Sequence, residues 1–121
     1  MTNTVDINID ERASLTVNVH LITPLGAPRD ISGYSITWNA TLNDDVVIGP
    51  KAIGAGIILG TPDDDDVISY FTLTFLPADT PLPDTKTYGV AMIYDHEARL
   101  TLSSNQYIGI RGRMFIMPSQ T

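Results

Sequence analysis

The stretch from Tyr34 to Leu42 constrains the fold more than any other part of the chain. Apolar and polar residues alternate strictly over its length, with apolar residues at every second position. Successive side chains of a β-strand point to opposite faces, whereas an amphipathic helix needs a spacing near 3.6 residues. The stretch therefore predicts a β-strand with one buried face. Trp38 lies in the middle of that face and is predicted to be a core residue.

The same alternation recurs along the rest of the chain. Short turns rich in Gly, Pro, Asn and Asp separate the alternating runs, as in an all-β protein. The longest helix that we expect is a single turn at 77–80. The expected strands cover residues 4–9, 15–21, 34–42, 46–48, 56–59, 67–76, 87–94, 97–102 and 107–117.

This layout predicts a single all-β domain over residues 1–121, with short tails at 1–3 and 119–121. About eight or nine short strands are typical of an antiparallel immunoglobulin-like β-sandwich. Asp79 and Thr80 precede Tyr88, as an Asp-Thr pair precedes the tyrosine corner of such domains. Tyr88 is expected to open a strand. Gly112 lies inside the last strand, where it predicts a bulge or a close backbone approach.

Composition excludes several kinds of function. The formal charge of −7 disfavours binding to nucleic acid and to anionic membrane. The chain has no cysteine, so disulfides, thiolate nucleophiles and Cys-ligated zinc are excluded. We expect neither a signal peptide nor a membrane span, because no segment has the required apolar length.

Four consecutive aspartates, Asp63 to Asp66, are the most conspicuous candidate for a metal site. Adjacent side chains of an extended segment point in opposite directions, so at most two of these carboxylates share a direction. A calcium ion needs six to eight converging oxygens, and the EF-hand spacing is absent. We therefore interpret Asp63, Asp64, Asp65 and Asp66 as a solvated loop, with weak cation binding as the alternative.

No other pattern predicts catalysis. The two histidines, His20 and His96, are too far apart in sequence to form a zinc motif, and His96 is expected in an exposed tight turn at 95–96. No serine lies in a nucleophile elbow, and the glycines at 49–60 match no phosphate-binding loop. The sequence thus predicts a protein that is not an enzyme and has no cofactor.

Two segments are candidates for contact with other proteins. The N-terminal strand carries Val5, Ile7 and Ile9, and it could add to a neighbouring sheet or exchange between copies. Arg111 and Arg113 flank Gly112 and could form a basic strip against an acidic neighbour. The alternative interpretation is that both arginines are simply solvated strand residues.

Several short motifs resemble those of the immunoglobulin-like domains of tailed-phage virion proteins, found at the start of baseplate upper proteins and in small standalone virion proteins. These motifs are Ile31-Ser32-Gly33 before the Trp38 strand, Asp79-Thr80 followed by Tyr88, and a final strand with Gly112 before apolar residues. The resemblance covers roughly residues 10–118.

The resemblance implies a non-enzymatic structural protein of a bacteriophage virion, either an accessory component of the tail or baseplate or a decoration of the capsid. It implies other virion proteins as partners, a homo-oligomer, and assembly in the host cytoplasm. The alternative is a carbohydrate-binding or adhesion module built on the same sandwich. Such a module would need exposed aromatic side chains.

Overall fold

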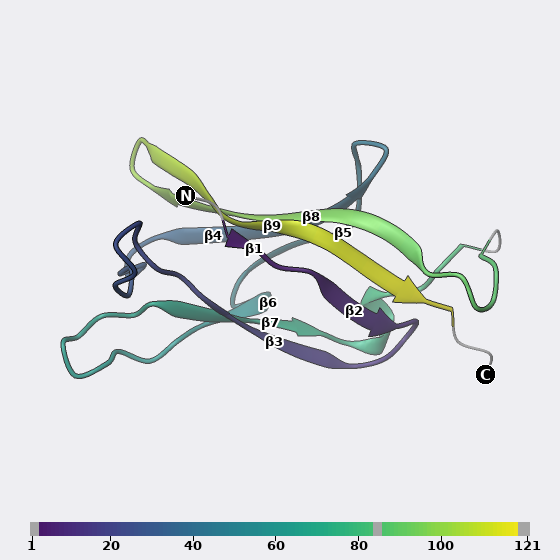
Figure 1. The fold of residues 1–121 in the computed structure, drawn as a ribbon, viewed down its shortest axis with the longest axis horizontal. Helices are drawn as coiled ribbons and strands as arrows, with labels where there is room; N and C mark the ends of the chain where they lie inside the picture. Colours follow the sequence, from purple (N-terminus) through teal and green to yellow (C-terminus); the bar gives the residue numbers. More distant parts are fainter. Residues whose placement is uncertain (1–2, 84–85, 119–121) are drawn as a thin grey trace.

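The computed structural model describes residues 3–83 and 86–118, and within them the protein is built almost entirely from β-strands (Figure 1). One turn of 3-10 helix, η1 (Pro77–Asp79), lies where the sequence predicts a single helical turn. The strands are β1 (Asn3–Thr4), β2 (Ile7–Asp10), β3 (Leu15–His20), β4 (Ser35–Leu42), β5 (Asp45–Ile53), β6 (Gly56–Leu59), β7 (Tyr70–Phe75), β8 (Met92–Leu102) and β9 (Asn105–Met117). The all-β prediction is confirmed.

All strands belong to one mixed sheet. Its hydrogen-bonded order is β1-β9-β8-β4-β5-β6-β7-β3, and β2 also pairs with β9. The expectation of a purely antiparallel sheet is wrong in two places. β1 and β2 run parallel to β9, and β5 runs parallel to β6. The first and last strands of the chain are therefore neighbours.

The sheet curls until it is nearly barrel-shaped, so that β3 and β7 lie across from β4, β8 and β9 (Figure 1). The apolar faces of the strands meet between these two layers. In β4, Ile36, Trp38 and Ala40 are buried, whereas Ser35 and Thr37 are exposed. The predicted core position of Trp38 is confirmed. Its ring meets the ring of Phe75 on β7 edge-on, with 5.2 Å between the ring centroids.

The segment 87–102 folds differently from the prediction. Instead of a hairpin turning at Asp95 and His96, β8 runs without interruption from Met92 to Leu102. It pairs with β4 on one side and with β9 on the other. His96 is a buried residue in the middle of that strand. The expected strand at 87–94 starts late, because residues 88–90 form a turn.

The close backbone approach predicted at Gly112 is confirmed. A Cβ atom placed on Gly112 would collide with the carbonyl oxygen of Val5, in the link between β1 and β2. The irregularity in the β8–β9 pairing lies elsewhere, since the register shifts between Ala98 and Arg99, opposite Gly109. Gly112 therefore lies where the link between β1 and β2 packs directly against β9.

The boundaries of two other segments also changed. β5 was expected at 46–48, ending at Gly49-Pro50, but it continues to Ile53. Of the predicted tails, Asn3 already belongs to β1, and residues 1–2 and 119–121 lie outside the described residues. No helix in the described part of the chain is long and apolar enough to cross a membrane.

Candidate functional site

The outer face of β8 and β9 carries a ladder of charged side chains. On β8, Asp95 and Glu97 alternate with core residues, and on β9 Arg111 and Arg113 do the same. The register places Asp95 directly opposite Arg113 and Glu97 directly opposite Arg111. Every side chain in the ladder therefore points away from the core. In these two pairs the acidic residue lies on β8 and the basic residue on β9, and Arg99 follows them on the same face of β8.

Glu97 is the centre of the ion pairs on this face. Its carboxylate accepts a hydrogen bond from Arg99 Nε at 2.9 Å and another from an Arg111 guanidinium nitrogen at 3.4 Å. Arg99 foremost, with help from Arg111, lowers the pKa of Glu97 below its ordinary value. Both guanidinium groups are at least half exposed, so these pairs contribute little to folding stability. Their charges remain accessible to a partner.

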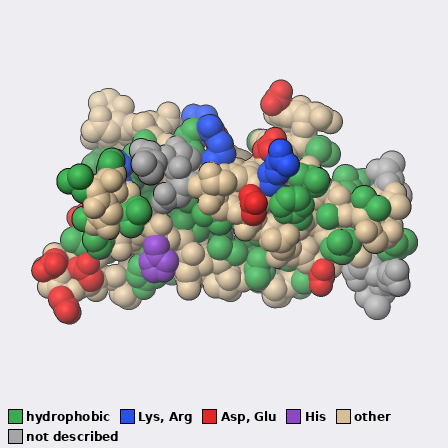
Figure 2. Space-filling view, in the orientation of Figure 1, with side chains coloured by type: hydrophobic (Ala, Val, Ile, Leu, Met, Phe, Trp, Pro, Cys, Tyr) green, Lys and Arg blue, Asp and Glu red, His purple; other side chains and the backbone are tan. Residues whose placement is uncertain are grey.

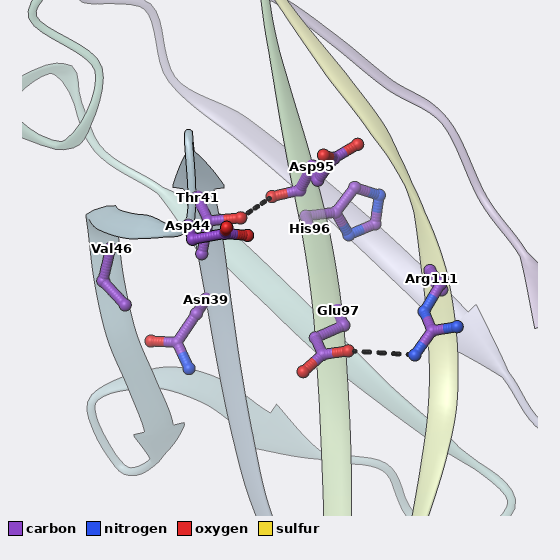
Figure 3. Close-up of a pocket in the computed structure, with 8 residues that line it drawn as sticks. All are labelled: Asn39, Thr41, Asp44, Val46, Asp95, His96, Glu97 and Arg111. Atoms are coloured by element: carbon purple, nitrogen blue, oxygen red, sulfur yellow. Dashed lines mark hydrogen bonds and ion pairs between the residues drawn. The ribbon is translucent and has the colours of Figure 1, made fainter.

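Next to the ladder, a hollow of about 460 Å³ opens over β4 and the start of β5 (Figure 3). Glu97 lies between Asn39 on β4 and Arg111 on β9, as the strand register requires. The lining residues are Asn39, Thr41, Asp44, Val46, Asp95, His96, Glu97 and Arg111. Among the described residues, no three His, Cys, Asp or Glu side chains are grouped so that they could hold a metal ion.

The same face becomes apolar toward the start of β8 and the end of β9. Ile93 lies opposite Phe115 in the register, and it is 49% exposed. Met117 is 39% exposed one step further along β9. Phe115 and Met117 also border a second hollow of about 380 Å³ beside β2. The outer face thus combines an apolar end with a charged middle, and we call it the β8–β9 face.

Beneath this face, His96 on β8 connects to β4 and to the link between β1 and β2. Its Nδ1 accepts a hydrogen bond from Trp38 Nε1 at 3.1 Å, and its Nε2 lies 2.6 Å from the carbonyl oxygen of Val5. Indole nitrogen can only donate and a carbonyl oxygen can only accept. The neutral imidazole with its proton on Nε2 is therefore the form that satisfies both contacts. The sequence around His96 does not indicate this role, because Asp-His-Glu is a composition typical of turns.

Burial lowers the pKa of His96 below its ordinary value of 6.5, although the Val5 carbonyl and the nearby Asp6 and Asp95 carboxylates oppose this shift. Unfolded His96 therefore takes up a proton more readily than folded His96. We expect the free energy of unfolding to fall as the pH drops below about 6.5, by at most about 1.4 kcal/mol per pH unit. Urea denaturation followed by circular dichroism at several pH values between 7.5 and 5 measures this change in the free energy of unfolding.

The variant His96→Gln tests whether His96 causes this pH dependence of stability. The glutamine amide can accept from Trp38 and donate to Val5 without titrating, so this variant should lose the stability change between pH 6.5 and 5. His20→Gln, at an exposed position on β3, is the matched control and should keep it. An unchanged pH dependence in His96→Gln would show that another group is responsible.

The two predicted contact segments have different outcomes. Arg111 and Arg113 are exposed on the β8–β9 face, where a partner can reach them. The N-terminal contact prediction needs correction, because Ile7 is 2% and Ile9 is 7% exposed. Both side chains point into the core, and Val5 is partly buried against it. β2 is held by β9 of its own chain, so Ile7 and Ile9 are core residues and Val5 packs against the core.

Asp63 to Asp66 form an exposed loop between β6 and β7, where acidic side chains gather at the tip (Figure 2). The carboxylate of Asp63 accepts hydrogen bonds from the backbone nitrogens of Asp65, at 2.8 Å, and Val67, at 3.0 Å. Asp66 adopts a left-handed backbone with φ 61°. One of the four carboxylates is thus used to close the loop itself.

Asp79 and Tyr88 do not form the expected tyrosine corner. Asp79 closes η1 by accepting a hydrogen bond from Leu76 N, and its carboxylate lies 2.9 Å from Lys51 Nζ. Burial raises the pKa of Asp79, but the Leu76 and Lys51 contacts outweigh it and the pKa is lowered overall. Tyr88 is 53% exposed in a turn. The buried tyrosine near the start of β8 is Tyr94 instead.

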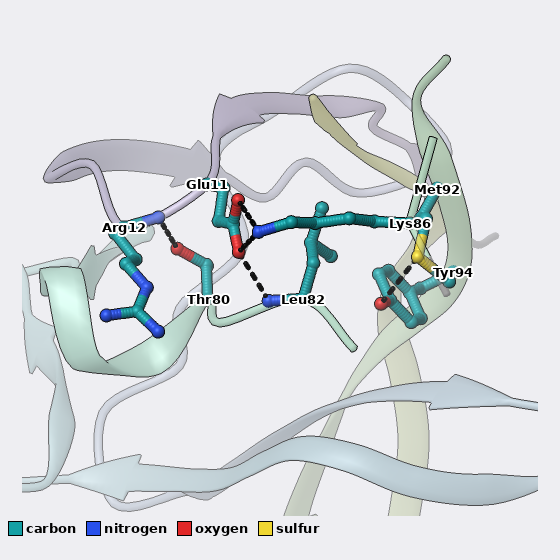
Figure 4. Close-up of polar contacts among 7 residues, drawn as sticks. All are labelled: Glu11, Arg12, Thr80, Leu82, Lys86, Met92 and Tyr94. Atoms are coloured by element: carbon teal, nitrogen blue, oxygen red, sulfur yellow. Dashed lines mark hydrogen bonds and ion pairs between the residues drawn. The ribbon is translucent and has the colours of Figure 1, made fainter. Parts of the chain in front are cut away.

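A buried polar cluster joins Thr80, Leu82 and Lys86 to the turn after β2 (Figure 4). The Glu11 side chain is 2% exposed and lies 2.9 Å from Lys86 Nζ. Its carboxylate also accepts a hydrogen bond from Leu82 N at 2.9 Å. Nearby, Arg12 N donates to the hydroxyl of Thr80 at 2.9 Å. No sequence pattern indicates this cluster, since Glu11 and Lys86 are 75 residues apart.

Comparisons with known proteins give little further information. No protein-family model and no curated protein matches the chain. One similar solved structure is the crystal structure of a 2,6-sialyltransferase from Vibrionaceae Photobacterium sp. JT-ISH-224, in a ternary complex with the donor product CMP and the acceptor substrate lactose. It has a TM-score of 0.38 and 13% identity, over 97% of this chain and only 18% of that chain. At that TM-score the likeness carries no argument about fold or function.

Proposed function

We propose that the domain is an immunoglobulin-like β-sandwich. The strand order supports this proposal, because β4, β8 and β9 form one layer, β3 and β7 form the other, and β2 lies parallel to the last strand. The contact between Trp38 on β4 and Phe75 on β7 joins the two layers through a central tryptophan, as in immunoglobulin domains.

We further propose that the protein is a non-enzymatic structural component of a tailed-phage virion, as the sequence resemblance implies. It works by binding other virion proteins and by forming a homo-oligomer during assembly in the host cytoplasm. The observation that carries this proposal is the β8–β9 face, where exposed Ile93 and Met117 adjoin Arg111 and Arg113. Apolar side chains together with arginines are the typical composition of protein interfaces.

Reversing the charge at both arginines tests the proposal. We expect Arg111→Glu with Arg113→Glu to leave the domain folded, because both side chains are exposed. The same variant should reduce the number of copies in purified virions by about tenfold or more, since acidic side chains would then cover both strands. Quantitative mass spectrometry of phage particles that encode the variant gives the copy number.

Arg12→Glu is the control for charge reversal at an exposed arginine, because Arg12 lies outside the β8–β9 face. It should leave the copy number unchanged. If the wild-type protein is not found in virions at all, the virion assignment is wrong. If the double variant is incorporated at the normal copy number, the β8–β9 face is not the surface that binds.

Carbohydrate binding remains the second candidate, and the polar hollow favours it. Asn39, Asp44, Glu97 and Arg111 offer amide, carboxylate and guanidinium groups that can hydrogen-bond to sugar hydroxyls. Its described lining includes no Tyr, Trp or Phe, the side chains on which sugar rings usually stack. Saturable binding of the isolated protein to a glycan array, lost in Asn39→Ala, would favour this candidate over protein assembly.

A further inference from the structure

On the β8–β9 face, three successive pairs of outward-facing residues are complementary across the two strands. Ile93 lies opposite Phe115, Asp95 opposite Arg113, and Glu97 opposite Arg111. Each pair joins two apolar groups or two opposite charges. A surface in which one strand complements its neighbour level by level can also complement a rotated copy of itself.

We propose that a second copy of this chain binds the β8–β9 face, related by a twofold axis that runs parallel to the strands and midway between β8 and β9. This inference rests on the proposed assembly function and specifies one partner and one geometry for it. Rotation about such an axis places β8 of one copy over β9 of the other without shifting it along the strand direction. Ile93, Asp95 and Glu97, which point outward from β8, then each face their register partner on β9 of the other copy.

The contacts across this interface follow from the register. Asp95 of each copy meets Arg113 of the other, and Glu97 meets Arg111. At the apolar end, Ile93 meets Phe115, so the exposed side chain of Ile93 is covered. Each contact occurs twice because the axis is twofold. A twofold axis perpendicular to the strands would instead stack β8 on β8, with carboxylates facing carboxylates, and is therefore disfavoured.

Charge also favours this face over the rest of the surface. The chain has 14 acidic and 7 basic residues, so two copies repel each other in most orientations. Three of its basic residues, Arg99, Arg111 and Arg113, lie on the β8–β9 face, together with Asp95 and Glu97. Contact through this face therefore brings arginines as well as carboxylates together and keeps most of the acidic residues outside the interface.

The test uses charge exchange in the full chain, measured by sedimentation equilibrium at low ionic strength. Asp95→Arg and Arg113→Asp are each expected to raise the dimer dissociation constant by about tenfold or more, because each creates two like-charge contacts. An equimolar mixture of these two single variants should form a heterodimer, since every Asp95–Arg113 contact then joins opposite charges again. The double variant with both substitutions should dimerise with itself.

The apolar end has its own test. Ile93→Lys should also weaken the dimer, whereas Ile58→Lys should not, because Ile58 is 63% exposed on β6, away from this face. Circular dichroism melting curves confirm that each variant is folded. A dimer that forms equally well in all variants, or a mixture of the two single variants that stays monomeric, would overturn the proposed geometry.

A wild-type chain that stays monomeric up to millimolar concentration would overturn the second copy as partner. That result would leave the virion assignment standing, because incorporation into particles is measured separately. Conversely, a dimer of the proposed geometry in a protein that is absent from virions would uphold this inference and reject the proposed function.

Discussion

Replacing Trp38 with alanine should lower the free energy of unfolding by about 3–5 kcal/mol, the typical cost of removing a fully buried tryptophan side chain. Trp38 is 0% exposed, and its ring packs edge-on against Phe75. The substitution also removes the donor to His96 Nδ1, so a buried acceptor loses its partner. Urea denaturation followed by far-UV circular dichroism measures the change. Tryptophan fluorescence cannot be used, because Trp38 is the only tryptophan in the chain.

Two further variants show how much of this loss of stability comes from burial and how much from the hydrogen bond to His96. Trp38→Phe keeps most of the apolar volume but not the indole N–H, so its cost should be smaller, about 1–3 kcal/mol. Tyr88→Ala removes an aromatic ring that is 53% exposed, and its cost should stay below about 1 kcal/mol. If Tyr88→Ala proved as costly as Trp38→Ala, the assignment of Tyr88 to an exposed turn would be wrong.

Gly112→Ala should have the second large effect, a loss of about 1–3 kcal/mol or more, because the added methyl group has no room. The atom it would meet is the backbone oxygen of Val5, not the end of a flexible side chain. Relief requires the segment that links β1 and β2 to move away from β9. Hydrogen exchange should therefore accelerate first at the amides of β2.

Gly109→Ala on the same strand is the matched control. The nearest atom to its new Cβ is the end of the Leu100 side chain, which can rotate away, so we expect a smaller loss of stability. β2 amides should keep their protection in this variant. If the two substitutions had equal effects, close packing along β9 in general, and not the contact with Val5, would be the cause of the lost stability.

The sequence predicts those parts of the fold in which neighbouring residues carry the whole signal. Alternation alone located β3, β4 and β7, because each has one apolar and one polar face. The same rule would have located all of β8 if His96 had been counted as an inward residue. His96 is inside because Trp38 and Val5, on distant segments, supply its hydrogen bonds.

The parts that could not be predicted depend on partners far apart in the chain. Lys51 is only 6% exposed because Asp79 and the ring of Phe75 lie beside its ammonium group. The pairing of the N-terminal strand with β9 buried Ile7 and Ile9, which an isolated strand would expose. For the candidate site, composition pointed to Arg111 and Arg113, but only the register shows the acidic strand beside them.

The parallel pairing of β2 with β9 has a mechanical consequence. Opposing forces applied to the two ends of the chain would pull β2 and β9 in opposite directions along their common axis. The hydrogen bonds between them would then be sheared together instead of being peeled apart one after another. Such a connection resists tension along the chain better than strands that peel apart bond by bond.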